Sequence, residues 1–560
     1  MVAKSGGSAG AGGASAARAV ELRTPWNAWG DNPSARTTKG LPSSGRVFLR
    51  REIGLAEDAP LRLPVPLDQM RLPPSRLLDE VRVRLAEVAE VVDDPETRIA
   101  HAGGKSYRDL VRRRSGDAGG APDAVVVPAD ADAVAAVLRV CADAQVAVVP
   151  FGGGTSVVGG VEPLRGRFAA VVTLDLSRLD QLLHLDPYSE LATFQPGVRG
   201  PAAEQLLRDC GFTLGHFPQS YEQASLGGYV ATRSAGQAST GFGRSDELVV
   251  GLRAATPAGE LVLGRAIRSA AGPDLRQLVV GSEGAFGVLT ELTLRVRRAP
   301  AARRYEAWFF RSFAEGADAF RTLRQADAAG DVCRLSDVDE TRAGLALSGH
   351  DRGVGPAYLR LRGRNCLAVL GWEGDREVIA ARRKRTAALL RTAGGLYIGQ
   401  GAGASWEKGR FSGPHLRDDL LDAGVLVETL ETATSWSQLV PVHDAVRDAL
   451  HRAFAARGET ALVMCHVSHV YATGASLYFT VLARQADDPE ASLVQWETAK
   501  KAATDALMNA GATLTHHHAV GADHLPWLEQ EVGELGVATL RAVKACLDPA
   551  GILNPGKLVP

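Results

Sequence analysis

The glycine-rich stretch from Pro150 to Gly160, PFGGGTSVVGG, constrains the fold of this chain more than any other feature. It follows the apolar run 146–149, so the glycines begin where a buried strand is expected to end. Successive glycines allow backbone angles that other residues avoid, and their N–H groups can converge on an anion. Thr155 and Ser156 add hydroxyl donors. The loop predicts a phosphate or pyrophosphate nest, although an ordinary surface turn would explain the loop if it stood alone.

Two familiar nucleotide-binding motifs do not match this loop. A Rossmann site needs G-x-G-x-x-G leading straight into a helix, whereas here the glycines run on towards Pro163 with no helix opening. A P-loop ends in Gly-Lys-Ser/Thr, which is absent here. Both nucleotide folds are therefore disfavoured.

Two further glycine loops follow in the same part of the chain. Residues 218–243 read PQSYEQASLGGYVATRSAGQASTGFG, and residues 281–287 read GSEGAFG. Both allow a close approach of backbone to a flat, polar ligand. Three such loops in one region favour an extended dinucleotide over a single phosphate.

Composition narrows the class of protein. The chain has 560 residues with 45% hydrophobic and 23% charged residues, which is typical of a soluble globular protein of two or three domains. A net charge of −1 gives no global field that would attract nucleic acid. The cysteines are scattered without a C-x-x-C pair, which fits a reducing compartment. With no signal-peptide pattern at the N-terminus and no peroxisomal address at the C-terminus, we expect a cytoplasmic protein.

Periodicity predicts an α+β chain with several parts. A helix is expected at 74–91, another after Asp130, a hairpin at 252–263 and an edge strand at 288–297. We expect these segments: a disordered Gly/Ala/Ser-rich tail at 1–20, a helical extension at 21–94, a ligand-binding domain at 95–300, an α+β cap domain at 301–534, and a C-terminal segment at 535–560 that returns to the ligand-binding domain.

The order of these motifs resembles a known flavoprotein family. PxGGGTS, then the GGxxATR segment, then GSEGxxGV is similar to the FAD domain of the vanillyl-alcohol oxidase/p-cresol methylhydroxylase superfamily. The motifs WNAWG, RLSD, HLRD, ETATSW and HHHAVG fall in the order found in the alkyl-dihydroxyacetonephosphate synthase family. The resemblance runs from Trp26 to the end, and it implies a two-subdomain FAD-binding domain of the p-cresol methylhydroxylase type followed by a cap that closes over the flavin.

The resemblance also implies which residues bind FAD, without a covalent link. These are Pro150, Phe151, Gly152, Gly153, Gly154, Thr155, Ser156, His216, Gln219, Ser220, Tyr221, Glu222, Gln223, Ala224, Ser225, Thr232, Arg233, Ser234, Ala235, Glu283, Gly284, Ala285, Phe286, Gly287, Val288 and Leu289.

The same family match implies a catalytic role for Tyr478 and for His516, His517 and His518. A phenol titrates near pH 10, so Tyr478 needs a cationic neighbour to act as a base near neutrality, and we expect the histidines to supply it. Without the match, core packing would be the better interpretation of a lone strand tyrosine.

Two arginines complete the implied site. Arg417 matches the arginine that binds the substrate phosphate, and Arg334 matches a second active-site arginine. A guanidinium binds phosphate in a bidentate manner, whereas either residue taken alone would more simply be a surface charge or an ordinary salt bridge.

The histidines also raise the question of a metal. On an extended chain, alternate side chains point to opposite faces, so at most two of His516, His517 and His518 could share a site. No Cys or carboxylate partner at zinc spacing is evident, and we predict no metal. Whether His466 and His469 recruit one stays open.

The resemblance implies an ether-forming enzyme that uses acyl-dihydroxyacetone phosphate and a long-chain fatty alcohol, with a flavin N5 adduct and no net redox change. Oxidised flavin is an electron sink, which suits such covalent catalysis. A homodimer and a peripheral membrane contact are further expectations. The alternatives are an FAD-linked 2-hydroxyacid dehydrogenase or oxidase, and a flavin- or acyl-lipid-binding protein that has lost turnover.

Overall fold

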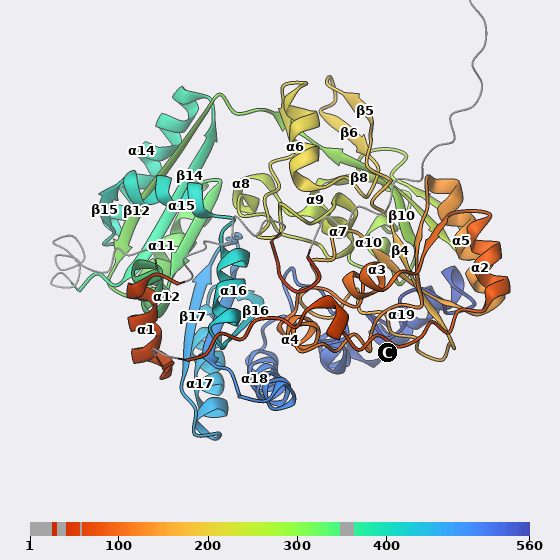
Figure 1. Cartoon of the computed structure of the whole chain (residues 1–560). Helices are drawn as coiled ribbons and strands as arrows, with labels where there is room; N and C mark the ends of the chain where they lie inside the picture. The colour runs from red at the N-terminus through yellow and green to blue at the C-terminus, as the bar shows by residue number, and fades with distance from the viewer. Residues whose placement is uncertain (1–24, 31–40, 57–58, 348–362) are drawn as a thin grey trace, which may run out of the picture.

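The computed structural model describes residues 25–30, 41–56, 59–347 and 363–560. The predicted tail at 1–20 lies outside these residues. Figure 1 shows two bodies side by side: one carries three small sheets, and the other is built on a single large sheet. The prediction of a mixed α+β protein is confirmed.

The first glycine loop leaves a four-stranded sheet. The sheet has the order β1 (Glu90–Val92), β2 (Ala124–Val127), β4 (Val171–Asp175) and β3 (Ala147–Phe151), with β2 and β3 parallel to β4. Helix α5 (Ala131–Ala144) begins where the Asp130 carboxylate accepts from the Ala133 N–H, and it buries Val134, Val137, Leu138 and Cys141, as predicted. The glycines therefore follow a buried parallel strand directly.

The second subdomain of this body is a five-stranded antiparallel sheet. Its order is β5 (Leu182–Asp186), β6 (Leu191–Phe194), β10 (Val288–Arg295), β8 (Val249–Thr256) and β9 (Gly259–Leu263). The prediction of β10 as an edge strand is wrong, because β10 pairs with β6 on one side and β8 on the other. Its alternation reflects one face that packs into the core, a pattern that central antiparallel strands share with edge strands.

Short helices connect these strands. They are α3 (Pro95–Ala100), α4 (Tyr107–Arg114), α6 (Gly200–Arg208), α7 (Leu226–Ala231), α8 (Ser239–Phe242), α9 (Ser245–Leu248) and α10 (Arg276–Val279). A two-stranded sheet of β7 (Phe212–Thr213) and β11 (Arg297–Arg298) leads towards the second body.

The second body is a seven-stranded antiparallel sheet. Its order is β15 (Leu396–Gly399), β12 (Ala302–Phe310), β14 (Cys366–Gly374), β13 (Val332–Ser336), β17 (Ala461–Val467), β18 (Gly474–Arg484) and β16 (Val425–Ser435). Its helices are α11 (Phe313–Gln325), α12 (Val338–Leu347), α14 (Arg376–Thr392), α15 (Gly401–Gly409), α16 (Gly413–Asp422), α17 (Leu439–Ala455) and α18 (Pro489–Asn509). The largest core cluster lies between this sheet and its helices.

Described segments near both ends of the chain pack onto these bodies. Helix α1 (Ser43–Ile53) contacts α12, while α2 (Asp79–Ala86) packs on α5. The predicted helix at 74–91 is shorter than expected, since the chain is extended at Leu78 and enters β1 at Glu90. Helix α19 (Leu528–Leu547) brings the C-terminus back to the first body, where Leu553 forms a bridge with Val148 of β3. Within the described residues, no helix is long and apolar enough to cross a bilayer.

Candidate active site

The three glycine loops meet around one pocket. Its lining includes Pro150, Phe151, Gly152, Ser156, Ser225, Thr232, Glu283, Gly284, Gly287, Val288 and Leu289 from the predicted flavin set, together with neighbouring small residues. Segments far apart in the sequence thus form one cavity, lined by glycines together with small and apolar residues.

The glycines are required chiefly because the loops touch one another. A Cβ on Gly153 would lie 2.1 Å from the carbonyl oxygen of Gln223, and a Cβ on Gly152 would lie 2.2 Å from the Ser225 hydroxyl. Gly154 has a φ of +65°, in the left-handed region. The triplet therefore packs against the second loop as well as opening space for a ligand.

Side chains of the second loop mostly contact other parts of the protein. Gln223 donates to the Trp29 carbonyl, Glu222 lies 3.1 Å from His415 Nε2, and the Tyr221 ring stacks on Phe411 at 5.0 Å. Trp29 itself is buried, and its N–H donates to Asp418 of α16. Of the other predicted flavin residues in this part of the loop, Gln219 and Ser220 lie in a turn and Ala224 is buried, and none of these three lines the pocket.

His216 is buried against the Tyr229 ring, and its Nε2 lies 3.1 Å from the Ser234 hydroxyl. Burial, with a smaller effect from His517, lowers the pKa of His216 to about 3, so the ring is neutral. Its Nδ1 has no hydrogen-bond partner among the described residues. By contrast, the Arg233 side chain points away to Asp246 and to main-chain carbonyls, while Ala235 is buried.

The third loop supplies the Glu283 carboxylate, which accepts hydrogen bonds from residues 520 and 521. Both N–H groups of Val520 and Gly521 donate to Glu283 at 2.9–3.1 Å. Burial is the main cause that raises the Glu283 pKa to about 7, against the lowering effect of these donors. Ala285 and Phe286 of the same loop are buried against Leu558 of the C-terminal segment.

Tyr478 lies in the middle of the cap sheet. It is paired with His466 of β17 on one side and with Glu431 of β16 on the other, so the three side chains share one face. The His466 ring stacks on the phenol at 4.9 Å, and the rings of His517 and His518 lie at 6.0 and 5.6 Å. Register across three strands assembles this row.

The histidines belong to a loop at residues 512–524, called here the histidine loop. Glu431 accepts hydrogen bonds from the N–H groups of His516, His517 and His518 at 2.7–3.0 Å. Val158 of the first glycine loop accepts from Ala522 and Asp523. The histidine loop is therefore clamped between the cap sheet and two of the glycine loops.

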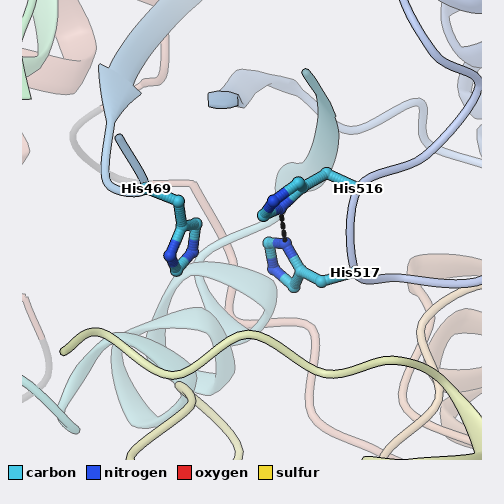
Figure 2. Close-up of side chains that lie close together, drawn as sticks. All are labelled: His469, His516 and His517. Carbon is cyan, nitrogen blue, oxygen red and sulfur yellow. Dashed lines mark hydrogen bonds between the residues drawn. The ribbon is translucent and has the colours of Figure 1, made fainter. Parts of the chain in front are cut away.

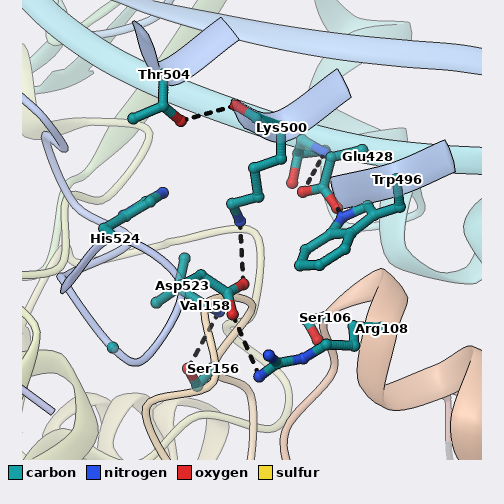
Figure 3. Close-up of polar contacts among 12 residues, drawn as sticks. Ser106, Arg108, Ser156, Val158, Glu428, Trp496, Lys500, Thr504, Asp523 and His524 are labelled. Atoms are coloured by element: carbon teal, nitrogen blue, oxygen red, sulfur yellow. Dashed lines mark hydrogen bonds and ion pairs between the residues drawn. The ribbon is translucent and has the colours of Figure 1, made fainter. Parts of the chain in front are cut away.

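A buried ion network fixes the far end of the histidine loop. Figure 3 shows the Asp523 carboxylate between Lys500 of α18 and Arg108 of α4, at 3.1 and 3.2 Å. Arg108 also pairs with Glu162 at 2.6 Å. Because helices from both bodies hold Asp523, this network links the cap to the body that carries the glycine loops.

Burial disfavours the cationic form expected of the histidines near Tyr478 for most of the cluster. Burial lowers the pKa of His516 to about 3 and holds the pKa of His518 and His469 well below the ordinary value. Burial also raises the pKa of Tyr478, and Thr429 and the Arg417 guanidinium oppose that rise. Arg417, a permanent cation, is the charge that favours a Tyr478 phenolate.

The two predicted arginines differ in their surroundings. Arg417 is buried and donates to the carbonyls of Lys105 and Val427 at 3.0 and 3.1 Å, while its Nε has no partner among the described residues. Arg334 is paired with Glu340 at 2.7 Å and contacts His466. Arg417 thus keeps a buried donor without a partner among the described residues and lowers the pKa of Tyr478 through its charge, whereas Arg334 is engaged by Glu340 and His466.

Three imidazoles converge next to this row. Figure 2 shows His516 and His517 joined through their Nδ1 atoms at 3.1 Å, with His469 facing them. One ring nitrogen from each lies within 4.8 Å of the others. The chain bends here, so the adjacent His516 and His517 approach each other, which the extended-chain argument did not anticipate. His469 also contacts the Ser239 hydroxyl, and His516 Nε2 lies 2.7 Å from the Tyr471 hydroxyl.

The residues present fit FAD. Glycines at which a Cβ would collide line the pocket, and two polar atoms of the predicted flavin set, His216 Nδ1 and Gln223 Oε1, have no hydrogen-bond partner among the described residues. Sequence reasoning missed Glu431, Asp523 and Tyr471. Only Glu431, inside the ETATSW motif, carried a signal that could have been followed.

Comparisons with known proteins agree with this geometry. Residues 122–264 match the "FAD binding domain" family model, and residues 299–558 match "FAD linked oxidases, C-terminal domain". The chain is 33% identical to alkyldihydroxyacetonephosphate synthase of Trypanosoma brucei brucei, over 96% of this chain and 92% of that protein.

Solved structures extend the likeness to three dimensions. A crystal structure of an alkyldihydroxyacetonephosphate synthase matches with a TM-score of 0.81 and 28% identity, over 96% of this chain and 99% of that one. Substrate-bound p-cresol methylhydroxylase matches with a TM-score of 0.67 and 14% identity, over 88% and 98%, which shows a shared fold.

Proposed function

The chain belongs to the alkyldihydroxyacetonephosphate synthase family, and we propose that it exchanges the acyl chain of acyl-dihydroxyacetone phosphate for a long-chain alcohol, using FAD. One observation carries the proposal. The histidine loop is held between Glu431, directly across from Tyr478 in the cap sheet, and Glu283 of the third glycine loop. This clamp brings proton-transferring side chains against the flavin pocket.

When bound, FAD supplies an electron sink for substrate activation. The residues of this chain supply proton transfer and binding. The charge of the Arg417 guanidinium opposes the effect of burial on the pKa of the Tyr478 phenol. His517 is the half-buried imidazole whose ring lies nearly parallel to that phenol, at an interplanar angle of 16°.

The phosphate of the substrate fits the Arg417 environment. This guanidinium is fixed by two carbonyls, and its unpartnered Nε is a buried donor that an anion would satisfy. A buried donor left without a partner costs about 1–3 kcal/mol, so filling it would favour an anionic substrate.

Both proposed organic substrates carry long apolar chains. We therefore propose that the protein is peripheral at a membrane surface. We also propose that it acts in the cytoplasm as a homodimer. Vesicle co-sedimentation and sedimentation velocity of the flavin-loaded protein test these two points separately.

The deciding experiment is incorporation of radiolabelled hexadecanol into an ether product from acyl-dihydroxyacetone phosphate. We expect label in the ether lipid, one fatty acid released per ether formed, and no net flavin reduction. Anaerobic bleaching of the flavin spectrum by a 2-hydroxy acid, with no ether product, would instead identify an FAD-linked dehydrogenase or oxidase. A flavin-loaded protein inactive in both assays would contradict the synthase proposal.

A further inference from the structure

We propose that Glu431 is a positioning residue that fixes the tautomer of His517, so that His517 Nε2 is the atom that takes up and returns the proton in the reaction. This inference deepens the proposed function and rests on it for the identity of the proton donor. The arrangement of donors around the Glu431 carboxylate is its starting point.

The Glu431 carboxylate is a buried anion surrounded by donors. The Thr515 hydroxyl donates to it at 2.5 Å, and the N–H groups of His516, His517 and His518 donate at 2.7–3.0 Å. Its side chain is 1% exposed. Burial alone would raise its pKa, yet His517, followed by the other imidazoles, holds the pKa well below its ordinary value. An ionised carboxylate is an acceptor only.

That acceptor faces a ring nitrogen of His517. His517 Nδ1 lies 3.3 Å from Glu431 Oε2 and 3.1 Å from His516 Nδ1. If Nδ1 of His517 carried a lone pair, it would face the carboxylate oxygens without a proton between them. The proton therefore belongs on Nδ1, and Nε2 keeps the lone pair.

The neighbouring ring agrees with this assignment. The one His517 Nδ1–H is then shared between Glu431 Oε2 and His516 Nδ1, so His516 carries its own proton on Nε2, 2.7 Å from the Tyr471 hydroxyl. Every ring nitrogen in this chain of contacts has a complementary partner except His517 Nε2, for which no contact within the described residues is found. The contacts of His517 with Glu431, of His516 with His517 and of His516 with Tyr471 thus select a single tautomer set.

This tautomer gives His517 a defined task. As the alcohol oxygen bonds to the dihydroxyacetone carbon, its hydroxyl proton goes to His517 Nε2. Over the whole exchange, the bond between that carbon and the ester oxygen breaks, and its electron pair leaves with the fatty acid carboxylate. The proton leaves Nε2 with the fatty acid or for solvent, so the imidazole returns to its neutral form. Throughout, Nδ1–H stays on Glu431, whose charge stabilises the imidazolium.

A tautomer measurement tests this directly. In flavin-loaded protein labelled with [15N]histidine, we expect His517 Nδ1 at a pyrrole-type shift and Nε2 at a pyridine-type shift, with the signals assigned by their loss in His517→Gln. The reverse pattern in the wild-type protein would overturn the proposal, even if no Glu431 variant folds. Because this readout needs no turnover, it is independent of whether ether lipid is made.

Two variants separate the positioning of the His517 ring from the anchoring of the histidine loop. Glu431→Gln keeps the shape of the side chain but offers an amide to Nδ1, so we expect kcat to fall by about 10²–10⁴-fold and the acid limb of the kcat/KM profile to move to lower pH. Glu531→Gln is the matched control, since Glu531 also anchors the histidine loop, through the Leu514 N–H and the Thr513 hydroxyl, but does not line the flavin pocket. We expect Glu531→Gln to leave the shape of that profile unchanged. Equal pH profiles for Glu431→Gln and the wild type, at equal flavin content, would overturn the proposal.

Discussion

The two walls of the active site are built in different ways. The flavin wall is built from the three glycine loops, and close contacts such as Gly153 against Gln223 leave no space for a side chain at those glycines. The cap wall is a set of single side chains from β17, β18, β16 and the histidine loop, held by register and by buried charge. Closely packed glycine positions tolerate little increase in side-chain volume. The cap wall is instead sensitive to the loss of single functional groups.

The largest effect is expected on the cap wall. Tyr478→Phe removes one hydroxyl without changing the packing of the ring, and we expect turnover to ether lipid to fall by about 10²–10⁴-fold with flavin content unchanged. Absorbance of the purified protein and the labelled-alcohol assay measure the two quantities. Tyr188→Phe is the control, because Tyr188 is 98% exposed. Wild-type turnover in Tyr478→Phe would remove the phenol from the chemistry.

On the flavin wall, a substitution should change flavin content and stability, which the Tyr478 variant leaves unchanged. Gly153→Ala places a methyl group 2.1 Å from the Gln223 carbonyl oxygen, and we expect a loss of about 1–3 kcal/mol in stability together with reduced flavin content. Gly401→Ala serves as the control, since a Cβ there meets no atom within 4 Å. Flavin titration and urea unfolding measure both changes. Full flavin content in Gly153→Ala would show that the first two loops can separate.

The two walls should also respond to pH with opposite signs. The pKa of His516 is depressed to about 3, so the unfolded state binds more protons between pH 6.5 and 3, and stability falls as pH falls. At pH 5 this single group costs about 2 kcal/mol. Urea unfolding of the wild type and of His516→Gln at pH 7 and 5 measures it, and the variant should lose less stability.

Glu283 has the reverse linkage. Its pKa is raised to about 7, so the native state binds more protons above pH 4.5, and the stabilising contribution is lost as pH rises through 7. Glu283→Gln should therefore flatten the fall in stability between pH 5.5 and 7.5, by an amount on the order of 2 kcal/mol. An unchanged slope would mean that the carboxyl is already ionised in the native protein at pH 5.5.

The smallest effect is expected from chelation. If His469, His516 and His517 act as hydrogen-bonding and proton-transferring groups, dialysis against EDTA should leave ether formation within experimental error of the untreated enzyme. Metal analysis of the same sample provides the control. Loss of activity that zinc restores would instead mean that the three converging imidazoles bind a metal ion.

The sequence by itself determined the flavin wall. Glycine spacing after an apolar strand is a local pattern, and the strand β3, the capped helix α5 and the three loops follow from short stretches of chain. Local patterns also placed Tyr478 on a strand and the histidines in one loop. They could not identify β10 as a central strand, because alternation depends on which face is buried and not on how many neighbours pair with it.

Only the tertiary structure decided how the cap wall works. Strand register places His466, Tyr478 and Glu431 in one row, although His466 and Glu431 are separated from each other by a helix and two strand ends. Burial at the cap wall lowers the pKa of most of its histidines, so that these rings are neutral. Arg417 is then the cation whose charge acts on the phenol. Protonation depends on desolvation and on neighbours that are distant in sequence, so the type of residue was readable in the chain while its charge and its partner were not.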